Sequence, residues 1–290
     1  MQDFDQKVGS AVRSPVRGWQ ALSGGCVADV RLASLADGRR VVVKAGEPGS
    51  KLDIEGRMLR YLAEHSSLPV PEVFIGDDDL LVMAYIEHGG GLGREGERHA
   101  AEILAALHNI KPTDAGESQN AYGLGFDTLI GGLPQPNGWD GSWASFFGKR
   151  RLVEMAEQAA RAGRCDRKLV ARIESLCGKM NELIGEASPP GLIHGDVWSG
   201  NVLAGDGRVA GLIDPAIYYA DPEVELAFIT LFSTFGREFF ERYDELRPIR
   251  KGFFETRKDL YNLYPLLVHT RLFGGGYLAS VERTLGAIGF

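Results

Sequence analysis

The chain has 290 residues, of which 44% are hydrophobic and 24% are charged, and its formal net charge is −7. This composition is typical of a globular protein and excludes a disordered or collagen-like chain. Because no long basic stripe offsets the negative charge, we expect no nucleic-acid partner.

Cysteine usage and hydropathy favour a cytoplasmic location. Cys26, Cys165 and Cys177 form no CxxC pair, which fits a reducing compartment. The N-terminus lacks the apolar segment of a secretion signal, and no run approaches membrane-spanning length. We therefore expect a cytoplasmic protein that has no membrane partner.

The N-terminal region predicts a weak helix up to about residue 17 and then a β-hairpin. The runs 19–22 and 27–32 are β-like, and the small residues Ser23, Gly24, Gly25 and Cys26 join them. A tight turn would explain the two glycines. A second interpretation is a loop that covers phosphates, since glycine lets backbone N–H groups approach an anion.

A β-branched run then ends in Lys44, whose amine could lie over the same phosphates. The segment that follows, 51–65, has helical spacing. Glu55 is the acid in this segment best placed to pair with Lys44, although Asp53 and Glu64 compete for the role.

Two further strands, 73–75 and 80–85, complete a predicted small sheet. The three glycines at 89–91 form a flexible join. We place the domain boundary there, which gives an N-terminal unit of residues 1–88 and a C-terminal unit of residues 89–290.

The C-terminal unit has mainly helical periodicity. Helices are predicted at 94–109, 143–162 and 166–185, and the end of the chain from 221 onward is also helical. The intervening segment, 111–142, is rich in Gly, Pro and Asn but contains several aromatic residues. Because loops of this length in compact domains are usually functional, we expect it to form a wall on the substrate side.

The stretch 192–203 carries the residues that indicate chemistry. A short apolar run leads into a polar loop that holds Asp196 and Asn201, and a second apolar run, 209–213, ends in Asp214. A carboxylate that accepts a hydroxyl proton, with an amide and a carboxylate for Mg²⁺, suits a magnesium–nucleotide enzyme. Asn201 follows Asp196 by five positions, which is the spacing of the kinase catalytic loop.

Four strings in the sequence carry a resemblance to a known family. The chain resembles the aminoglycoside phosphotransferase branch of the protein-kinase-like fold and, within it, the fructosamine kinase (ketosamine 3-kinase) family. The strings are Gly24-Gly25-Cys26, Gln135-Pro136-Asn137-Gly138-Trp139, His194-Gly195-Asp196-Val197-Trp198-Ser199-Gly200-Asn201 and Ile213-Asp214-Pro215-Ala216-Ile217-Tyr218-Tyr219.

The resemblance implies a fold, a reaction and cofactors. The fold would be α+β with two lobes: a small N-lobe of antiparallel sheet plus a helix, and a larger, mainly helical C-lobe. The reaction would be ATP-dependent phosphorylation of the 3-hydroxyl of a ketosamine, free or on a protein lysine, which counts as deglycation. Asp196 would be the catalytic base, and Asn201 and Asp214 would bind Mg²⁺.

The resemblance also assigns binding residues. Met83 would flank the adenine, and the backbone of Ala84 and Ile86 would hydrogen-bond it. Trp198, next to the catalytic aspartate, is our choice for stacking on the sugar. Weaker choices for substrate contact are Trp139 and Trp143. The Gly-rich loop departs from the kinase pattern G-x-G-x-x-G, so the phosphate-binding amides stay unassigned.

Cys26 lies beside the glycines expected to cover phosphate, where a small buried residue would be the simpler interpretation. We hypothesise a redox-sensitive thiol, because backbone amides could lower its pKa. Such a thiol could cross-link two subunits, and we expect a monomer or a weak homodimer.

Two alternative functions stay open. One is a kinase for an aminoglycoside or another small hydroxylated molecule, for which a carboxylate-rich substrate cleft would be the sign. The other is a nucleotide-binding pseudokinase with a regulatory role. The catalytic set argues against the second because it is intact: Lys44, Asp196, Asn201 and Asp214.

Overall fold

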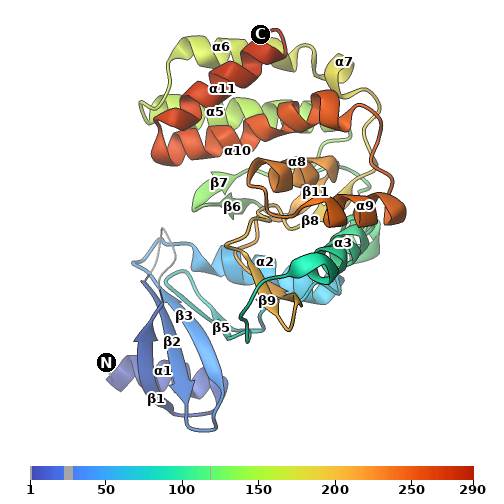
Figure 1. Cartoon of the computed structure of the whole chain (residues 1–290). Coiled ribbons are helices and arrows are strands. Elements are labelled where there is room, and N and C mark those ends of the chain that lie inside the picture. The colour runs from blue at the N-terminus through green and yellow to red at the C-terminus, as the bar shows by residue number, and fades with distance from the viewer. Residues whose placement is uncertain (1, 23–28, 118) are drawn as a thin grey trace.

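The computed structural model describes residues 2–22, 29–117 and 119–290. Its N-terminal part is an antiparallel five-stranded sheet in the order β1-β2-β3-β5-β4 (Figure 1). The strands are β1 (Val16–Ala21), β2 (Asp29–Leu35), β3 (Arg40–Ala45), β4 (Val73–Gly76) and β5 (Leu80–Ala84).

The side chains of β3 alternate between the two faces of the sheet, and each face is covered by a different helix. Val41 and Val43 are buried in a cluster with α1 (Gln2–Val12), whereas Val42 packs with the cluster under α2 (Leu52–His65). Successive side chains of a strand point to opposite faces, so one β-branched run serves both helices. The same alternation places Lys44 on the α2 side.

Helix α2 belongs to both parts of the molecule. Its Leu52 and Leu59 pack on the sheet with Leu81 and Met83. Its Met58 and Leu62 belong to the main core of the C-terminal part, together with Leu104, Trp143 and Phe146. The helix therefore fixes the sheet against the rest of the chain.

The C-terminal part is mainly helical, and its outermost layer is the stack of α5, α6, α10 and α11 (Figure 1). Its helices are α3 (Gly93–His108), α4 (Trp143–Phe146), α5 (Glu154–Arg161), α6 (Arg167–Cys177), α7 (Met180–Ile184), α8 (Glu223–Leu231), α9 (Arg237–Leu246), α10 (Lys258–Phe273) and α11 (Gly276–Ala287). There are also a short 3-10 helix, η1 (Pro112–Ala115), and π-helical stretches, η2 (Phe147–Val153) and η3 (Phe253–Arg257).

In the part of the chain that the structure describes, three two-stranded sheets lie between the N-terminal sheet and the helical layer. They pair β6 (Thr128–Ile130) with β7 (Leu133–Gln135), β8 (Gly191–Ile193) with β11 (Tyr218–Ala220), and β9 (Val202–Gly205) with β10 (Arg208–Leu212). The β8–β11 and β9–β10 pairs hold the two ends of the polar loop that carries Asp196 and Asn201. The predicted α+β architecture, a small N-terminal antiparallel sheet with a helix and a larger, mainly helical part, is confirmed.

Two predicted segments are more structured than expected. The region 111–142 contains the β6–β7 hairpin, which local composition did not indicate. The helix predicted at 143–162 changes to a π-helix over Phe147–Val153 before α5 begins.

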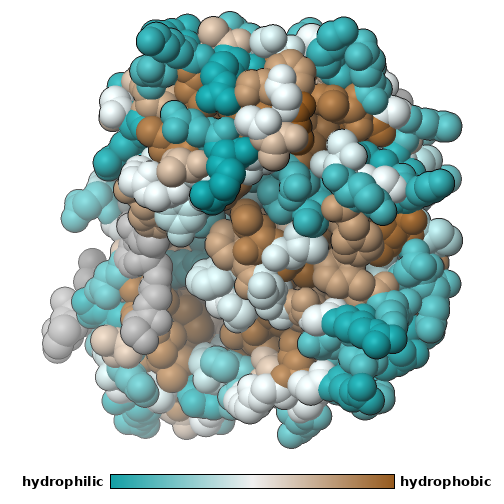
Figure 2. Space-filling view, turned by 45° about the horizontal axis from the view of Figure 1, so that its top comes forward, coloured by the Kyte–Doolittle hydropathy of each residue, from teal (hydrophilic) through white to brown (hydrophobic). Residues whose placement is uncertain are grey.

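One face of the molecule has apolar residues at its centre with hydrophilic residues around them (Figure 2). None of the helices within the described ranges is long and apolar enough to span a bilayer.

Because Leu62 joins α2 to the core of the C-terminal part and is fully buried, we predict that Leu62→Ala lowers the free energy of unfolding by about 2–5 kcal/mol. Denaturant unfolding would measure the loss. Leu246→Ala is the matched control, since Leu246 is 42% exposed. Equal stability of the two variants would contradict the role given to α2.

Candidate active site

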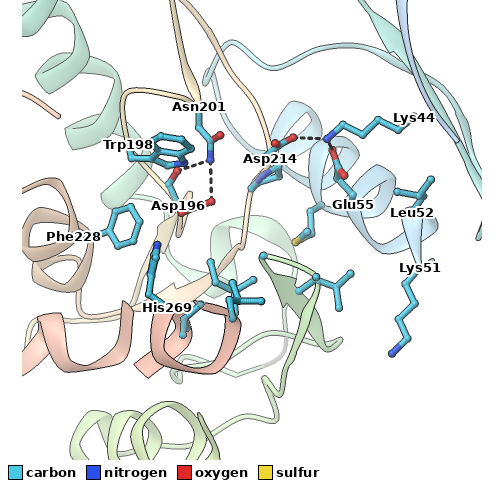
Figure 3. A pocket seen from close by; sticks show the side chains of 18 of the residues that line it. Lys44, Lys51, Leu52, Glu55, Asp196, Trp198, Asn201, Asp214, Phe228 and His269 are labelled. Atoms are coloured by element: carbon cyan, nitrogen blue, oxygen red, sulfur yellow. Dashed lines mark hydrogen bonds and ion pairs between the residues drawn. The ribbon is translucent and has the colours of Figure 1, made fainter. Parts of the chain in front are cut away.

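A cavity of about 470 Å³ lies where the N-terminal sheet, α2 and the C-terminal part meet (Figure 3). One end is polar, and the other is lined by apolar and aromatic side chains. The polar end holds Lys44, Glu55, Asp196, Asn201 and Asp214. The structure thus brings together residues that the sequence separates by up to 170 positions.

Lys44 makes the central contact of the polar end. Its Nζ lies 2.8 Å from Glu55 Oε1 and 2.5 Å from Asp214 Oδ1. Burial alone would lower the pKa of Lys44, but the two carboxylates outweigh it and raise that pKa above its ordinary value. The amine is therefore a fixed positive charge, paired with Glu55 rather than with Asp53 or Glu64.

Asp214 follows β10 and adopts a left-handed conformation with φ 54°. This conformation is uncommon outside glycine and often marks functional sites. The backbone N–H of Ile213 donates to the carbonyl of Asn201 at 3.1 Å, which holds the two segments together. An amide oxygen and a carboxylate are hard ligands that suit Mg²⁺, so Asn201 and Asp214 fit the predicted ion.

Asp196 lies at the junction of the polar and aromatic ends of the cavity. Asn201 Nδ2 donates to its carboxylate at 2.9 Å and to its backbone carbonyl at 3.0 Å. Burial raises the pKa of Asp196 to about 7, the Asn201 hydrogen bond opposes this, and the charges of Asp214 and Glu225 add to it. A carboxylate tuned in this way can accept a proton near neutral pH.

The aromatic end of the cavity comes from four segments. Trp198 contributes from the loop that carries Asp196, and it is 40% exposed. Gly200 allows its position, because a Cβ there would lie 2.4 Å from the indole ring. The remaining aromatic lining residues come from α8, α10 and α11 and the residues next to them: Phe228, Phe232, His269, Phe273 and Tyr277. The turn of the β6–β7 hairpin, Gly131 and Gly132, completes this wall.

Comparison with known proteins identifies the family of this chain. The fructosamine kinase family model matches residues 2–288. The chain belongs to the fructosamine kinase family. A probable ketoamine kinase from Synechocystis is 33% identical over 98% of this chain and 94% of its own length. A chloroplastic protein-ribulosamine 3-kinase from Oryza sativa subsp. indica is 32% identical over 91% of this chain and 77% of its own.

Solved structures agree with this family. A candidate fructosamine-3-kinase from Thermobifida fusca has a TM-score of 0.86 and 28% identity, covering 99% of this chain and 98% of its own. The aminoglycoside phosphotransferase of a gentamicin complex has a TM-score of 0.64 at 16% identity, which shows a shared fold alone. The prediction of a phosphotransferase with an alcohol acceptor is confirmed at the level of the family.

The structure corrects one of the predicted substrate contacts. Trp143 is 2% exposed, and its Nε1 donates to the hydroxyl of Tyr261 at 3.1 Å within the core. Its ring therefore cannot stack on a substrate. Trp139 is half-buried, stacks on Tyr219 and does not line the cavity. Of the three predicted tryptophans, only Trp198 reaches the cavity.

The predicted adenine contacts lie outside the cavity lining. Met83 is 3% exposed and packs under α2, and the N–H of Ala84 donates to the carbonyl of Glu72 at 2.8 Å. Ile86 packs against Gly211 of β10. The roles of these three residues stay predictions. The predicted phosphate-covering residues Ser23, Gly24 and Gly25 and the predicted redox thiol of Cys26 lie outside the described residues.

Sequence reasoning missed the buried group that holds the backbone next to Asp196. Glu225 of α8 is fully buried, and its Oε1 accepts the N–H of Gly195 at 2.5 Å. Gly195 itself needs φ +87°, and a Cβ there would lie 2.2 Å from the carbonyl of Ala216. Burial alone would raise the pKa of Glu225, but its interactions with His108 lower it.

His108 extends this contact to a third helix. Its Nε2 lies 2.8 Å from Glu225 Oε2, and its Nδ1 lies 2.7 Å from the hydroxyl of Tyr243. Because His108 is buried between Glu225 and Tyr243, it links α3 and α9 to the carboxylate that holds Gly195. No spacing in the sequence indicates this contact.

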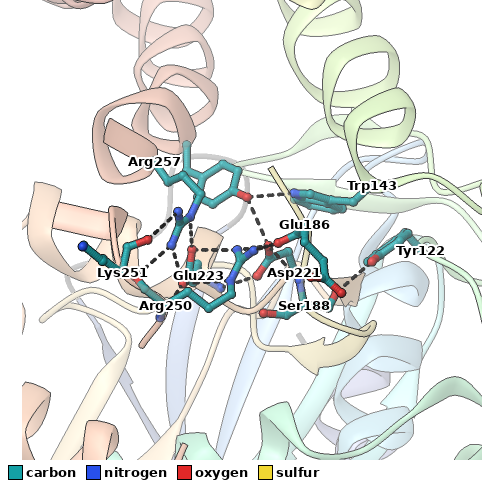
Figure 4. Close-up of polar contacts among 10 residues, drawn as sticks. Tyr122, Trp143, Glu186, Ser188, Asp221, Glu223, Arg250, Lys251 and Arg257 are labelled. Atoms are coloured by element: carbon teal, nitrogen blue, oxygen red, sulfur yellow. Dashed lines mark hydrogen bonds and ion pairs between the residues drawn. The ribbon is translucent and has the colours of Figure 1, made fainter. Parts of the chain in front are cut away.

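The first residues of α8 are themselves held by buried charges (Figure 4). Glu223 pairs with Arg257 through Oε2 at 2.6 Å and with Arg250 at 2.8 Å. Asp221 pairs with Arg250 at 2.6 Å and accepts the N–H of Glu223 at 3.2 Å. Because Glu225 lies on the same helical turn, this network fixes the carboxylate that holds Gly195.

We predict that Glu225→Gln lowers kcat roughly 100-fold. The two carboxylate oxygens accept the N–H groups of Gly195 and His194, so an amide NH₂ in place of either oxygen would face a backbone N–H and displace Asp196 by a fraction of an ångström. Steady-state kinetics would measure kcat, and equilibrium titration with ATP should show unchanged affinity. Glu241→Gln is the control, since that side chain is 49% exposed on α9. An unchanged kcat in Glu225→Gln would rule out the positioning role.

Proposed function

We propose that this protein is an ATP-dependent ketosamine 3-kinase that phosphorylates the 3-hydroxyl of sugar adducts on amines or protein lysines. One observation carries the proposal: a single cavity joins the carboxylate of Asp196 and its ion-binding partners to an aromatic acceptor end. The names of the relatives, ketoamine kinase and ribulosamine 3-kinase, support the same acceptor class.

The distribution of charge in the cavity favours a sugar-amine acceptor over an aminoglycoside. The described carboxylates that line it are Glu55, Asp196 and Asp214, and all three belong to the polar end. A polycationic aminoglycoside would need carboxylates at the acceptor end as well. Aromatic faces instead suit one protonated amine through cation–π attraction and the apolar face of a sugar through stacking.

Each residue of the polar end has a separate role in the proposed phosphoryl transfer. Asp196 accepts a hydrogen bond from the attacking 3-hydroxyl and takes its proton while the 3-oxygen bonds to the γ-phosphorus of ATP and the bond from that phosphorus to the ADP leaving group breaks. Lys44, held by Glu55, compensates charge on the phosphates of ATP. Asn201 and Asp214 would hold Mg²⁺, which supplies charge neutralisation at the transferred group. Positioning and electrostatic stabilisation are the main demands of this reaction.

The product explains why the activity would count as deglycation. A phosphate on the 3-hydroxyl of a ketosamine favours spontaneous breakdown of the adduct. The breakdown restores the free amine, and no further residue of the protein is required for it. The proposed reaction therefore ends with a repaired amine on a small molecule or a protein.

We predict that Asp196→Asn lowers kcat for phosphoryl transfer by roughly 10²–10⁴-fold, since the amide cannot accept the hydroxyl proton. ATP binding, followed by calorimetry, should stay near that of the wild-type protein. Asp79→Asn, at an exposed turn position, is the control and should keep full activity. Full turnover in Asp196→Asn would refute the mechanism.

The acceptor class is tested by measuring ATP consumption with fructose-, ribulose- and erythrulose-lysine beside kanamycin-type acceptors. We expect turnover of ketosamines alone, and we expect Trp198→Ala to raise the ketosamine KM roughly tenfold through lost stacking. Turnover of kanamycin alone would favour the aminoglycoside alternative. ATP binding without turnover of any acceptor would favour the pseudokinase.

A further inference from the structure

Arg151 is a buried cation without a buried anion. It lies in the π-helical stretch Phe147–Val153, and the residue is 0% exposed. Among the described residues no carboxylate pairs with it, whereas the other deeply buried arginine, Arg257, pairs with Glu223 (Figure 4). Burying a charge without a counter-ion is costly, so the contacts that replace the counter-ion indicate what this residue does.

Three aromatic rings and neutral oxygens surround the guanidinium. Its Cζ lies 3.9 Å from the ring centroid of Tyr218, 4.6 Å from that of Phe146 and 5.6 Å from that of Tyr264. Nη1 donates to the carbonyl of Pro136 at 2.7 Å, and Nη2 donates to Asn137 Oδ1. A planar, weakly hydrated guanidinium suits such a site, because it can stack and donate in a fixed fork at the same time.

The hydrogen bonds continue from Asn137 to the β6–β7 hairpin. Asn137 Nδ2 donates to Thr128 Oγ1 at 2.7 Å, and Gln135 Nε2 donates to the same oxygen at 2.8 Å. Thr128 is the first residue of β6 and Gln135 is the last residue of β7, so these hydrogen bonds hold both strands at the open end of the hairpin. The turn between them, at 131–132, forms part of the acceptor wall of the cavity.

The same hairpin is tied to the catalytic residues. Gln135 Nε2 also donates to the carbonyl of Ala216 at 3.0 Å, and its Oε1 accepts the hydroxyl of Tyr264 at 2.8 Å. Ala216 lies two residues after Asp214, and its N–H donates to the carbonyl of His194 at 2.8 Å. An unbroken path of contacts therefore runs from Arg151 to the loop that carries Asp196.

We propose that Arg151 is a positioning residue that fixes the β6–β7 acceptor wall against the Asp196 and Asp214 loops, so that an acceptor hydroxyl rather than water receives the phosphoryl group. The inference rests on the proposed function for the identity of the acceptor. It goes beyond that function because Arg151 touches neither the cavity nor any residue assigned to the nucleotide. A substitution of Arg151 should therefore change the kinetics of the acceptor and leave the KM for ATP unchanged.

The test measures how well ATP consumption is coupled to acceptor phosphorylation in Arg151→Met and Arg151→Lys. We expect kcat/KM for the ketosamine to fall roughly 100-fold, as for a displacement of about 1 Å, while the KM for ATP stays unchanged. The ratio of ATP hydrolysed to ketosamine phosphorylated should rise. A smaller fraction of folded protein alone would reduce ATP hydrolysis and ketosamine phosphorylation in proportion, and the ratio would stay unchanged.

Two further variants keep the proposal testable if Arg151→Met fails to fold. Gln135→Leu breaks the path at its other end and should give the same uncoupling. The double variant Arg151→Lys/Gln135→Leu should be no worse than the more severe single variant, because both act through one network. Arg150→Met, next to Arg151 in the chain, is the matched control and should behave like the wild-type protein.

The outcomes separate this inference from the proposed function. A wild-type protein without ketosamine turnover contradicts the proposed function, and the coupling ratio is then measured with whichever acceptor the screen finds. Wild-type coupling in both Arg151→Lys and Gln135→Leu overturns the positioning role. Additive losses in the double variant also overturn it, because they would mean that the two residues act independently.

Discussion

The contact of Lys44 with Glu55 and Asp214 is the interaction on which the site depends. It joins β3, α2 and the segment after β10, and Asp214 lies 170 positions after Lys44 in the chain. The members of this contact depend on one another. The buried amine of Lys44 needs the carboxylates to stay charged, and its positive charge offsets the repulsion between Asp214 and Asp196. The three-residue contact therefore sets the charge of the polar end and links the N-terminal sheet and α2 to the C-terminal part.

Around this contact the protein satisfies its buried charges in two different ways. Glu225 accepts the backbone N–H groups of Gly195 and His194 and lies 2.8 Å from His108 Nε2, so a buried carboxylate holds the loop next to Asp196. Arg151 has aromatic rings and carbonyl oxygens in place of a counter-ion. A buried ion pair is weak evidence for stability, since an apolar replacement often stabilises a protein as much or more, so the contacts of these two groups are better explained by the geometry that they set.

The division of the cavity into a charged end and an aromatic end follows from the topology. Lys44, Asp196 and Asp214 lie at or next to strand ends and Glu55 lies on α2, whereas most aromatic lining residues come from α8, α10 and α11. The strand ends supply rigid, closely spaced oxygen atoms. The helices present large side chains whose backbone is already paired, so they can form an apolar wall without unsatisfied polar groups.

Local pattern was sufficient for the N-terminal sheet, for α2 and for the polar half of the site, but not for the β6–β7 hairpin. The β-branched run that ends in Lys44, the helical spacing around Glu55, and the interval from Asp196 to Asn201 each depend on residues near one another in the chain. Alternation and helical periodicity are local properties, and the catalytic set was predicted from them together with the family resemblance. The pairing of Lys44 with Glu55 was anticipated because both neighbouring elements could be recognised.

Only the tertiary structure decided which large side chains face the acceptor. Trp143 and Trp198 are indistinguishable as residue types, yet one is in the core and the other lines the cavity, because burial depends on how distant helices pack. Phe232 and His269 line the cavity from helices whose apolar spacing indicated only a core. The roles of Glu225, His108 and Arg151 likewise depend on contacts across many positions, which a single sequence does not encode in any local spacing.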